Sequence, residues 1–167
     1  IKLDKKMKYH VVVDSTIKPG SMTYGEKIIK GSSDKEFLFS SYCCHPSMAN
    51  DNLSGLILWT LLLRELNGKK LKNNYRFITV PETIGSIYYL SSHETEMKNI
   101  VGGFVLTCTA GSNRFSYKKT FVENHFLDKI SIDVLENNGE KFEIFPFDIN
   151  GSDERQYSAP FFRIPIG

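Results

Sequence analysis

The sequence has little net charge, few cysteines and no long hydrophobic run, and each shortage excludes a class of protein. Its 21 lysines and arginines are almost balanced by 19 aspartates and glutamates, which leaves a formal net charge of +2. We therefore expect no nucleic-acid partner and no polybasic membrane anchor. The longest apolar stretch, Leu53–Leu63, is interrupted by Ser54, Gly55 and Thr60 and is too short to cross a bilayer, so no membrane association is expected.

The three cysteines, Cys43, Cys44 and Cys108, are too few for a disulfide framework. Adjacent cysteines rarely bond to each other, because a disulfide needs its two Cα atoms farther apart than neighbouring residues allow. No Cys-x-x-Cys motif is present, which argues against a dithiol redox protein. The cysteine content therefore predicts a reducing, cytoplasmic location.

The composition is that of a folded domain, with 41% hydrophobic and 24% charged residues in a chain of 167. The chain begins with Ile1, and its last segment, "FFRIPIG", reads as a strand that stops abruptly. We expect residues 1–167 to form a single domain that is a piece of a longer protein, with residues 1–35 as an accessory β-hairpin region. An unpaired strand edge at the end would favour self-association.

Strand-like and helix-like segments alternate from residue 36 onward. The expected strands cover residues 9–15, 26–31, 36–44, 73–81, 101–109, 141–147 and 161–166. The expected helices cover residues 52–66, 83–93 and 123–139, and Asp51 or Asn52 is a natural N-cap for the first of them. This alternation predicts an α/β fold, a three-layer sandwich with a central, mostly parallel (mixed) sheet.

Polar side chains follow several of the predicted strands, at the edge of the sheet where ligands bind in open parallel sheets. His45, Glu82, Cys108 and the "GSDER" segment (151–155) each come at or after a strand end. An imidazole and carboxylates suit zinc, and Asp51 at a helix N-terminus would be well held to bridge cations. Glu82 is placed to be a metal ligand or the base that takes a proton from water.

Each of these residues also has an ordinary structural explanation. The His-Pro pair at residue 45 is compatible with a simple turn, and Asp51 with a simple helix cap. Glu82 resembles any exposed loop glutamate, and a cysteine such as Cys108 is more often a small core residue than a ligand. The joint arrangement at strand ends, rather than any single residue, favours a metal site.

Three motifs carry a resemblance to a known family. "HPSMANDNLSG", "PETIGS" and "GSDERQY" together resemble the metal-binding segments of the co-catalytic zinc aminopeptidases, which include bacterial leucyl aminopeptidase and glutamate carboxypeptidase. The sequence is most similar to a bacterial subfamily of aminopeptidase-like domains of uncertain function, often encoded near surface-polysaccharide genes. The motifs occur in the same order as in that subfamily, and the resemblance covers nearly the whole chain.

The resemblance implies a role for each matching residue. His45 matches a ligand of one zinc, and Asp51 matches the carboxylate that bridges two zincs. Glu82 matches the acidic segment that supplies a base and a ligand, and Cys108 falls where the family has an aspartate ligand. In the later segment Asp153 matches a position beside the ligands. The resemblance thus implies one or two zinc ions as cofactor in the full-length protein, whereas we expect weak or absent zinc binding in this chain. It also implies a set of supporting or substrate-binding residues, Asn52, Ser152, Asp153, Glu154 and Arg155.

The sequence also departs from the family. Pro81-Glu82 stands where the wider family has two consecutive glutamates, and the family's last histidine ligand lies beyond the "RIPIG" segment. His10, His93 and His125 have no matching context and are expected to be surface or packing residues. Cys43 and Cys44 are expected to belong to a strand and its end rather than to the metal site.

Two functions stay open at this point. The first is a zinc-dependent metallohydrolase of aminopeptidase type that cleaves a peptide or related amide small-molecule substrate, with Glu82 as proton shuttle. The second is a catalytically degraded peptidase-fold domain that binds a ligand or partner, with a link to surface-polysaccharide biosynthesis. Retention of the motifs favours the first for the whole protein. The single glutamate, Cys108 and the absent histidine favour the second for this 167-residue chain, which we expect to be inactive.

Overall fold

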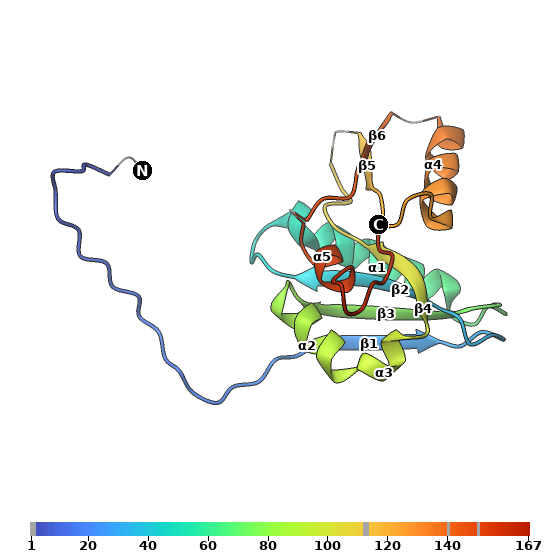
Figure 1. Cartoon of the computed structure of the whole chain (residues 1–167), viewed down its shortest axis with the longest axis horizontal. Coiled ribbons are helices and arrows are strands. Elements are labelled where there is room, and N and C mark those ends of the chain that lie inside the picture. The colour runs from blue at the N-terminus through green and yellow to red at the C-terminus, as the bar shows by residue number, and fades with distance from the viewer. Residues whose placement is uncertain (1–2, 112–113, 140, 150) are drawn as a thin grey trace.

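The computed structural model describes residues 3–111, 114–139, 141–149 and 151–167. Its helices and strands alternate along much of the chain (Figure 1). In chain order they are β1 (Gly25–Ile29), β2 (Glu36–Cys43), η1 (Ala49–Ser54), α1 (Gly55–Leu66), β3 (Asn74–Pro81), α2 (Ile84–Ser92), α3 (Glu94–Met97), β4 (Ile100–Val105), β5 (Phe115–Lys118), α4 (Phe126–Asn138), β6 (Phe142–Phe145) and α5 (Glu154–Tyr157).

The main sheet has four strands in the order β1-β3-β2-β4. β2 runs parallel to both of its neighbours, β3 and β4, whereas β1 is antiparallel to β3. A second, two-stranded sheet pairs β5 with β6 in parallel and lies beside α4 (Figure 1). The predicted α/β fold with a mixed, mostly parallel central sheet is therefore confirmed.

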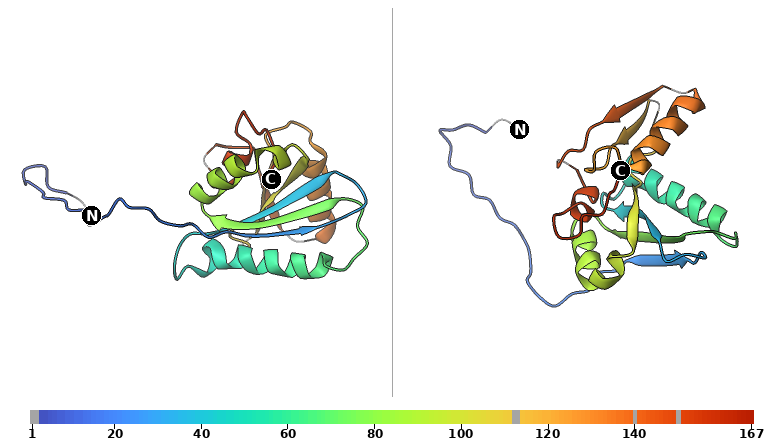
Figure 2. Two further views of the ribbon diagram at one scale, coloured as in Figure 1. Left: turned by 90° about the horizontal axis from the view of Figure 1, so that it is seen from below. Right: turned by 45° about the vertical axis from the view of Figure 1, so that its right-hand side comes forward.

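Helices cover both faces of the main sheet, as Figure 2 shows, with α1 on one face and α2 on the other. On the α1 face, aromatic rings stack along the sheet, and the ring centroids of Phe39 and Phe77 are 5.0 Å apart. Trp59 of α1 contacts the Phe77 ring edge-on, with 5.6 Å between the ring centroids. On the other face, Leu38 and Ile78 are fully buried in a core that also includes Tyr89 and Tyr157. Alternation of side chains along each strand explains why one sheet presents two different apolar surfaces.

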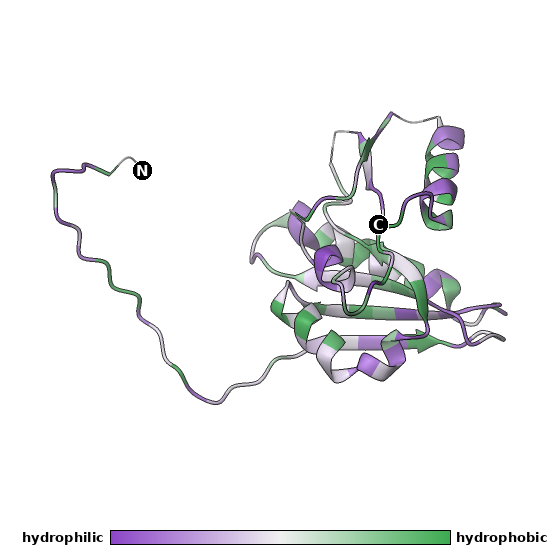
Figure 3. Cartoon of the chain, viewed as in Figure 1, coloured by the Kyte–Doolittle hydropathy of each residue, from purple (hydrophilic) through white to green (hydrophobic). Residues whose placement is uncertain are grey.

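The strand predicted at residues 9–15 is wrong. These residues form neither a helix nor a strand, and Val11, Val12 and Val13 are each more than 70% exposed. They belong to an extended arm that runs away from the domain and carries hydrophobic stretches (Figure 3). A strand is stable only when its backbone groups find a partner, and valine content alone supplies none.

The accessory hairpin expected within residues 1–35 does not form among the described residues, which begin at residue 3. Its second strand exists as β1, but β1 pairs with β3 in the main sheet.

The strand expected at residues 161–166 is also absent. There the backbone turns, with Arg163 N–H donating to Ala159 O, and only Ile166 forms a bridge, to Gly103. Ile164 and Ile166 are buried, which accounts for the strand-like pattern.

Candidate metal centre

The ends of β2 and β3 place the first and second motifs side by side. The strands run in register from Glu36 opposite Asn74 to Cys43 opposite Pro81. Glu82 N–H then donates to Cys43 O at 3.1 Å, so the two chain segments stay together beyond the sheet. Parallel pairing thus brings residues far apart in the sequence to one edge, as the strand-end prediction required.

A turn after β2 brings Asp51 back over the strand end. Ser47 has a positive φ of 69°, and Met48 N–H donates to His45 O at 3.4 Å. Asp51 and Asn52 then have non-helical backbone angles, and the peptide bond between them is cis. The chain becomes regular only at Gly55, where an added Cβ would lie 2.1 Å from Leu106 O. Glycine is therefore required at this point, because the helix starts against the end of β4.

The prediction that Asp51 or Asn52 caps the helix is wrong. Ser54 occupies the N-cap position of α1, and no helix amide donates to the Asp51 carboxylate among the hydrogen bonds of the described residues. Asp51 Oδ1 accepts instead from the Tyr42 hydroxyl at 3.1 Å. The irregular backbone before α1 turns the carboxylate toward the strand end and away from the helix axis.

Asn52 acts as a clamp between η1 and the strand ends. It is only 3% exposed, and its amide nitrogen donates to Ser41 Oγ at 3.1 Å and Leu106 O at 3.2 Å. Its Oδ1 accepts from Cys108 N–H at 3.1 Å. A buried amide with its donors and acceptor used holds the loop firmly. Asn52 therefore positions the loop, while its supporting role in a metal site stays a prediction.

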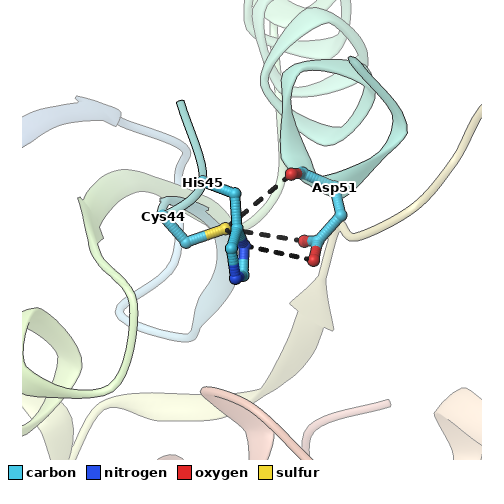
Figure 4. A group of neighbouring side chains, drawn as sticks. All are labelled: Cys44, His45 and Asp51. Atoms are coloured by element: carbon cyan, nitrogen blue, oxygen red, sulfur yellow. Dashed lines mark hydrogen bonds and ion pairs between the residues drawn. The ribbon is translucent and has the colours of Figure 1, made fainter. Parts of the chain in front are cut away.

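Cys44, His45 and Asp51 form a cluster of three potential ligands (Figure 4), called the trio below. His45 Nδ1 lies 2.8 Å from Cys44 Sγ and 3.3 Å from Asp51 Oδ2, and Cys44 Sγ lies 3.6 Å from Asp51 Oδ1. One donor atom from each residue lies within 4.8 Å of the others. No lysine or arginine of the described residues pairs with any of them.

Cys44 was expected to belong with Cys43 to a strand and its end, away from the metal site, whereas the structure places its thiol in the trio. β2 ends at Cys43, whose Sγ is near Thr79 Oγ1, 3.9 Å away. Cys44 lies outside the ladder, and its thiol faces Asp51. Partial burial raises the pKa of the Cys44 thiol to about 11, and the carboxylates of Asp51 and Glu82 add to this rise. Its position immediately before His45 was the available signal.

Glu82 lies near the trio without belonging to it. Its Oε1 accepts from the Ser152 hydroxyl at 2.5 Å. The next residue, Thr83, has a positive φ of 63° and donates its N–H to Asp153 Oδ1 at 2.7 Å. The "GSDER" segment therefore holds the loop that carries Glu82, while the supporting role of Ser152 and Asp153 stays a prediction.

Asp153 is fully buried, and its Oδ2 has no hydrogen-bond partner among the described residues. Burial raises its pKa from 3.8 to about 6, although the Thr83 N–H and the Ser86 hydroxyl lower it. Glu154 is also buried and pairs with Lys118 Nζ at 2.7 Å. Arg155 is exposed and does not belong to the trio, so its predicted role stays a prediction.

Cys108 lies outside the trio. It is exposed, with a positive φ of 49°, and its Sγ is 3.6 Å from Thr107 Oγ1. The alternative that Cys108 is a core residue is therefore wrong, whereas its role as a ligand stays a prediction. The other three histidines lie away from the trio. The ring of His93 stacks on that of Tyr89, with 4.2 Å between the ring centroids. His125 accepts from Leu127 N–H as a helix cap, and His10 lies exposed on the arm.

A cavity of about 530 Å³ opens beside the trio. Cys44 and His45 line it together with apolar side chains, among them Met48, Leu53 and Leu56. Polar donors at one side of a mostly apolar hollow are typical of a small-molecule site. The geometry can thus hold a cation at the strand ends and an apolar group next to it.

Comparison with known proteins agrees with this description. The structure is similar to the crystal structure of a "putative peptidase" from Clostridium acetobutylicum, with a TM-score of 0.84 and 43% identity over 86% of this chain and 34% of the other. The chain therefore shares its α/β fold with the matching part of that protein. Among the described residues, no helix is both long and apolar enough to cross a membrane.

The chain can also be assigned to a protein family. The family described as "Domain of unknown function (DUF4910)" matches residues 7–167, so the chain belongs to this family. A Clostridium acetobutylicum relative, named "putative polysaccharide biosynthesis protein with aminopeptidase-like domain", is 45% identical over 159 residues. The match covers 95% of this chain and 37% of that relative, so the chain spans little more than a third of its length.

Proposed function

We propose that this chain is the metal-binding domain of a zinc-dependent hydrolase of aminopeptidase type, which cleaves a peptide or a related amide bond. One observation carries the proposal: His45 Nδ1 and Asp51 Oδ2 lie 3.3 Å apart at the end of β2, beside the cavity. Glu82 follows the neighbouring strand, and its N–H is bonded to Cys43 O. The aminopeptidase-like and peptidase names of the two relatives support the same reaction class.

The residues present fit a divalent cation of the zinc type. An imidazole nitrogen and a carboxylate oxygen are common zinc ligands, and two such ligands of a tetrahedral ion lie about 3.3 Å apart. His45 and Asp51 would hold the ion. Tyr42 donates its hydroxyl to the other carboxylate oxygen of Asp51, which orients the ligand as outer partners do in metal sites.

The remaining chemistry falls to the protein's own side chains. A divalent cation supplies Lewis acidity, which polarises a substrate carbonyl and makes a nearby water easier to deprotonate. The Glu82 carboxylate would take that proton and deliver it to the departing amine. The Ser152 hydroxyl, 2.5 Å from Glu82 Oε1, holds one carboxylate oxygen and leaves the other for proton transfer. Met48, Leu53 and Leu56 would receive an apolar part of the substrate.

A second candidate is a non-catalytic binding domain in a polysaccharide biosynthesis protein. The single glutamate in the Pro81-Glu82 segment favours it, because the hydrolase needs both a base and enough ligands. The exposure of Cys108, outside the trio, favours it as well. This candidate predicts ligand binding in the cavity without turnover, so the experiment that separates the two is an activity assay.

The test combines metal binding with turnover, and it uses the whole protein because the 167-residue chain by itself is expected to be inactive. We expect the whole protein to bind zinc in a chelator-competition titration, and His45→Ala to weaken its zinc affinity by at least about tenfold. His10→Ala, on the exposed arm, is the matched control and should match the wild type. With an aminoacyl-arylamide substrate, Glu82→Gln should abolish turnover while zinc stays bound. Unchanged zinc affinity in His45→Ala would overturn the metal centre, and zinc binding without turnover would favour the binding domain.

A further inference from the structure

Cys44 has the surroundings of a metal ligand. Among the described residues, the hydrogen-bonding partners of its thiol are the His45 ring and the carboxylate and backbone carbonyl of Asp51. A cysteine that only filled space would instead contact apolar side chains. Figure 4 shows the sulfur beside the imidazole ring, with dashed lines from this pair of side chains to the carboxylate and the backbone oxygen of Asp51.

The distances in the trio suit a tetrahedral ion. With bonds of about 2.0 Å to nitrogen or oxygen and about 2.3 Å to sulfur, neighbouring ligand atoms are about 3.3–3.6 Å apart. The separations that involve Asp51 are 3.3 Å to His45 Nδ1 and 3.6 Å to Cys44 Sγ, though through different carboxylate oxygens. The distance between Cys44 Sγ and His45 Nδ1 is 2.8 Å, and it would have to increase by roughly 0.8 Å when both atoms bind one ion. Rotation of the two side chains can supply this change.

We propose that Cys44 is a third protein ligand, so that the site holds a thiophilic divalent cation through one sulfur, one nitrogen and one oxygen. This inference rests on the proposed function, which needs only His45 and Asp51. It adds selectivity: a thiolate favours zinc, cobalt or cadmium over magnesium and calcium, which prefer oxygen ligands alone. Three protein ligands on a four-coordinate ion leave one position for water or substrate.

The backbone supports the assignment of Cys44 rather than of the other two cysteines. Cys43 is the last residue of β2, is exposed, and has its sulfur next to Thr79. Cys108 is exposed and follows β4, outside the group of atoms that meet at the trio. The chain therefore offers two natural controls, each with a thiol near the site and neither with the geometry of Cys44.

Cobalt(II) gives a direct readout, because a thiolate bound to cobalt produces an intense charge-transfer absorption in the near ultraviolet. We would add cobalt(II) to the reduced, metal-free protein and to Cys44→Ser, Cys43→Ser and Cys108→Ser. The wild type and the Cys43 and Cys108 variants should show the charge-transfer band. Cys44→Ser should lose it, retain the visible ligand-field bands, and bind cobalt at least about tenfold more weakly. Circular dichroism and thermal unfolding check that each variant is folded.

The outcomes separate this inference from the proposed function. A charge-transfer band that survives in Cys44→Ser, or disappears in Cys108→Ser instead, would overturn the assignment of Cys44. Ligand-field bands without any charge-transfer band in the wild type would also overturn it, and would leave the metal centre of His45 and Asp51 intact. No cobalt binding at all, in a protein that is folded, would refute the proposed function and the Cys44 assignment together.

Discussion

Replacing Asp153 by asparagine should change how the stability of this protein depends on pH. The carboxyl is 0% exposed, and one of its oxygens has no hydrogen-bond partner among the described residues. Desolvation is the largest cause of its raised pKa, and the negative charges of Glu82 and Glu154 act in the same direction. An asparagine side chain has nearly the same shape but no charge to desolvate. Its amide oxygen could still accept from Thr83 N–H and the Ser86 hydroxyl, as Asp153 Oδ1 does.

The size of the effect follows from the pKa difference between the folded and unfolded states. The pKa rises from 3.8 to about 6, and one pKa unit corresponds to about 1.36 kcal/mol, so the ionised carboxylate costs the folded state about 3 kcal/mol. Between these two pKa values the folded protein binds more protons than the unfolded chain, and stability falls as pH rises. The cost is absent below pH 3.8 and fully present above about pH 6.

The assay is urea unfolding of the wild type and Asp153→Asn at several pH values between about 4 and 7, with a chelator present to remove metal. The stability difference between the two proteins should shift by about 3 kcal/mol in favour of the variant as pH rises across this range. Asp133→Asn, an exposed change on α4, should follow the wild type throughout. A constant difference between Asp153→Asn and the wild type across the whole pH range would refute the argument.

Two further predictions concern stability. Arg76→Met removes the cation that pairs with two carboxylates on β1 and β2, and the loss of one partner from a buried ion pair should cost about 3–5 kcal/mol in chemical unfolding; Lys69→Met, at an exposed pair, should change nothing measurable. Gly103→Ala places a Cβ 2.0 Å from a backbone carbonyl oxygen of β2. We expect it to lower the free energy of unfolding by about 1–3 kcal/mol and the thermal midpoint with it, whereas Gly20→Ala, in open space, should leave both unchanged. A stable Arg76→Met or Gly103→Ala protein would contradict the packing described here.

The sequence alone determined the layered fold and the place of the candidate site. Its alternation of strand-like and helix-like segments predicted the main sheet, and parallel pairing necessarily gathers the strand ends at one edge. His45 and Glu82 could be assigned to that edge because each follows a strand in the chain, and Asp51 because it stands just before the helix that comes next. Local patterns suffice for such placement, since both periodicity and strand direction are properties of short segments.

The tertiary structure decided which side chains meet. Asp51 turns toward Tyr42 instead of capping α1, and Cys44 joins His45, because the backbone angles of the intervening turn set the direction of each side chain. Sequence spacing does not contain those angles. The same holds for residues 9–15, which have the composition of a strand but no partner, and for the burial of Asp153, which depends on segments that only the folded chain brings together.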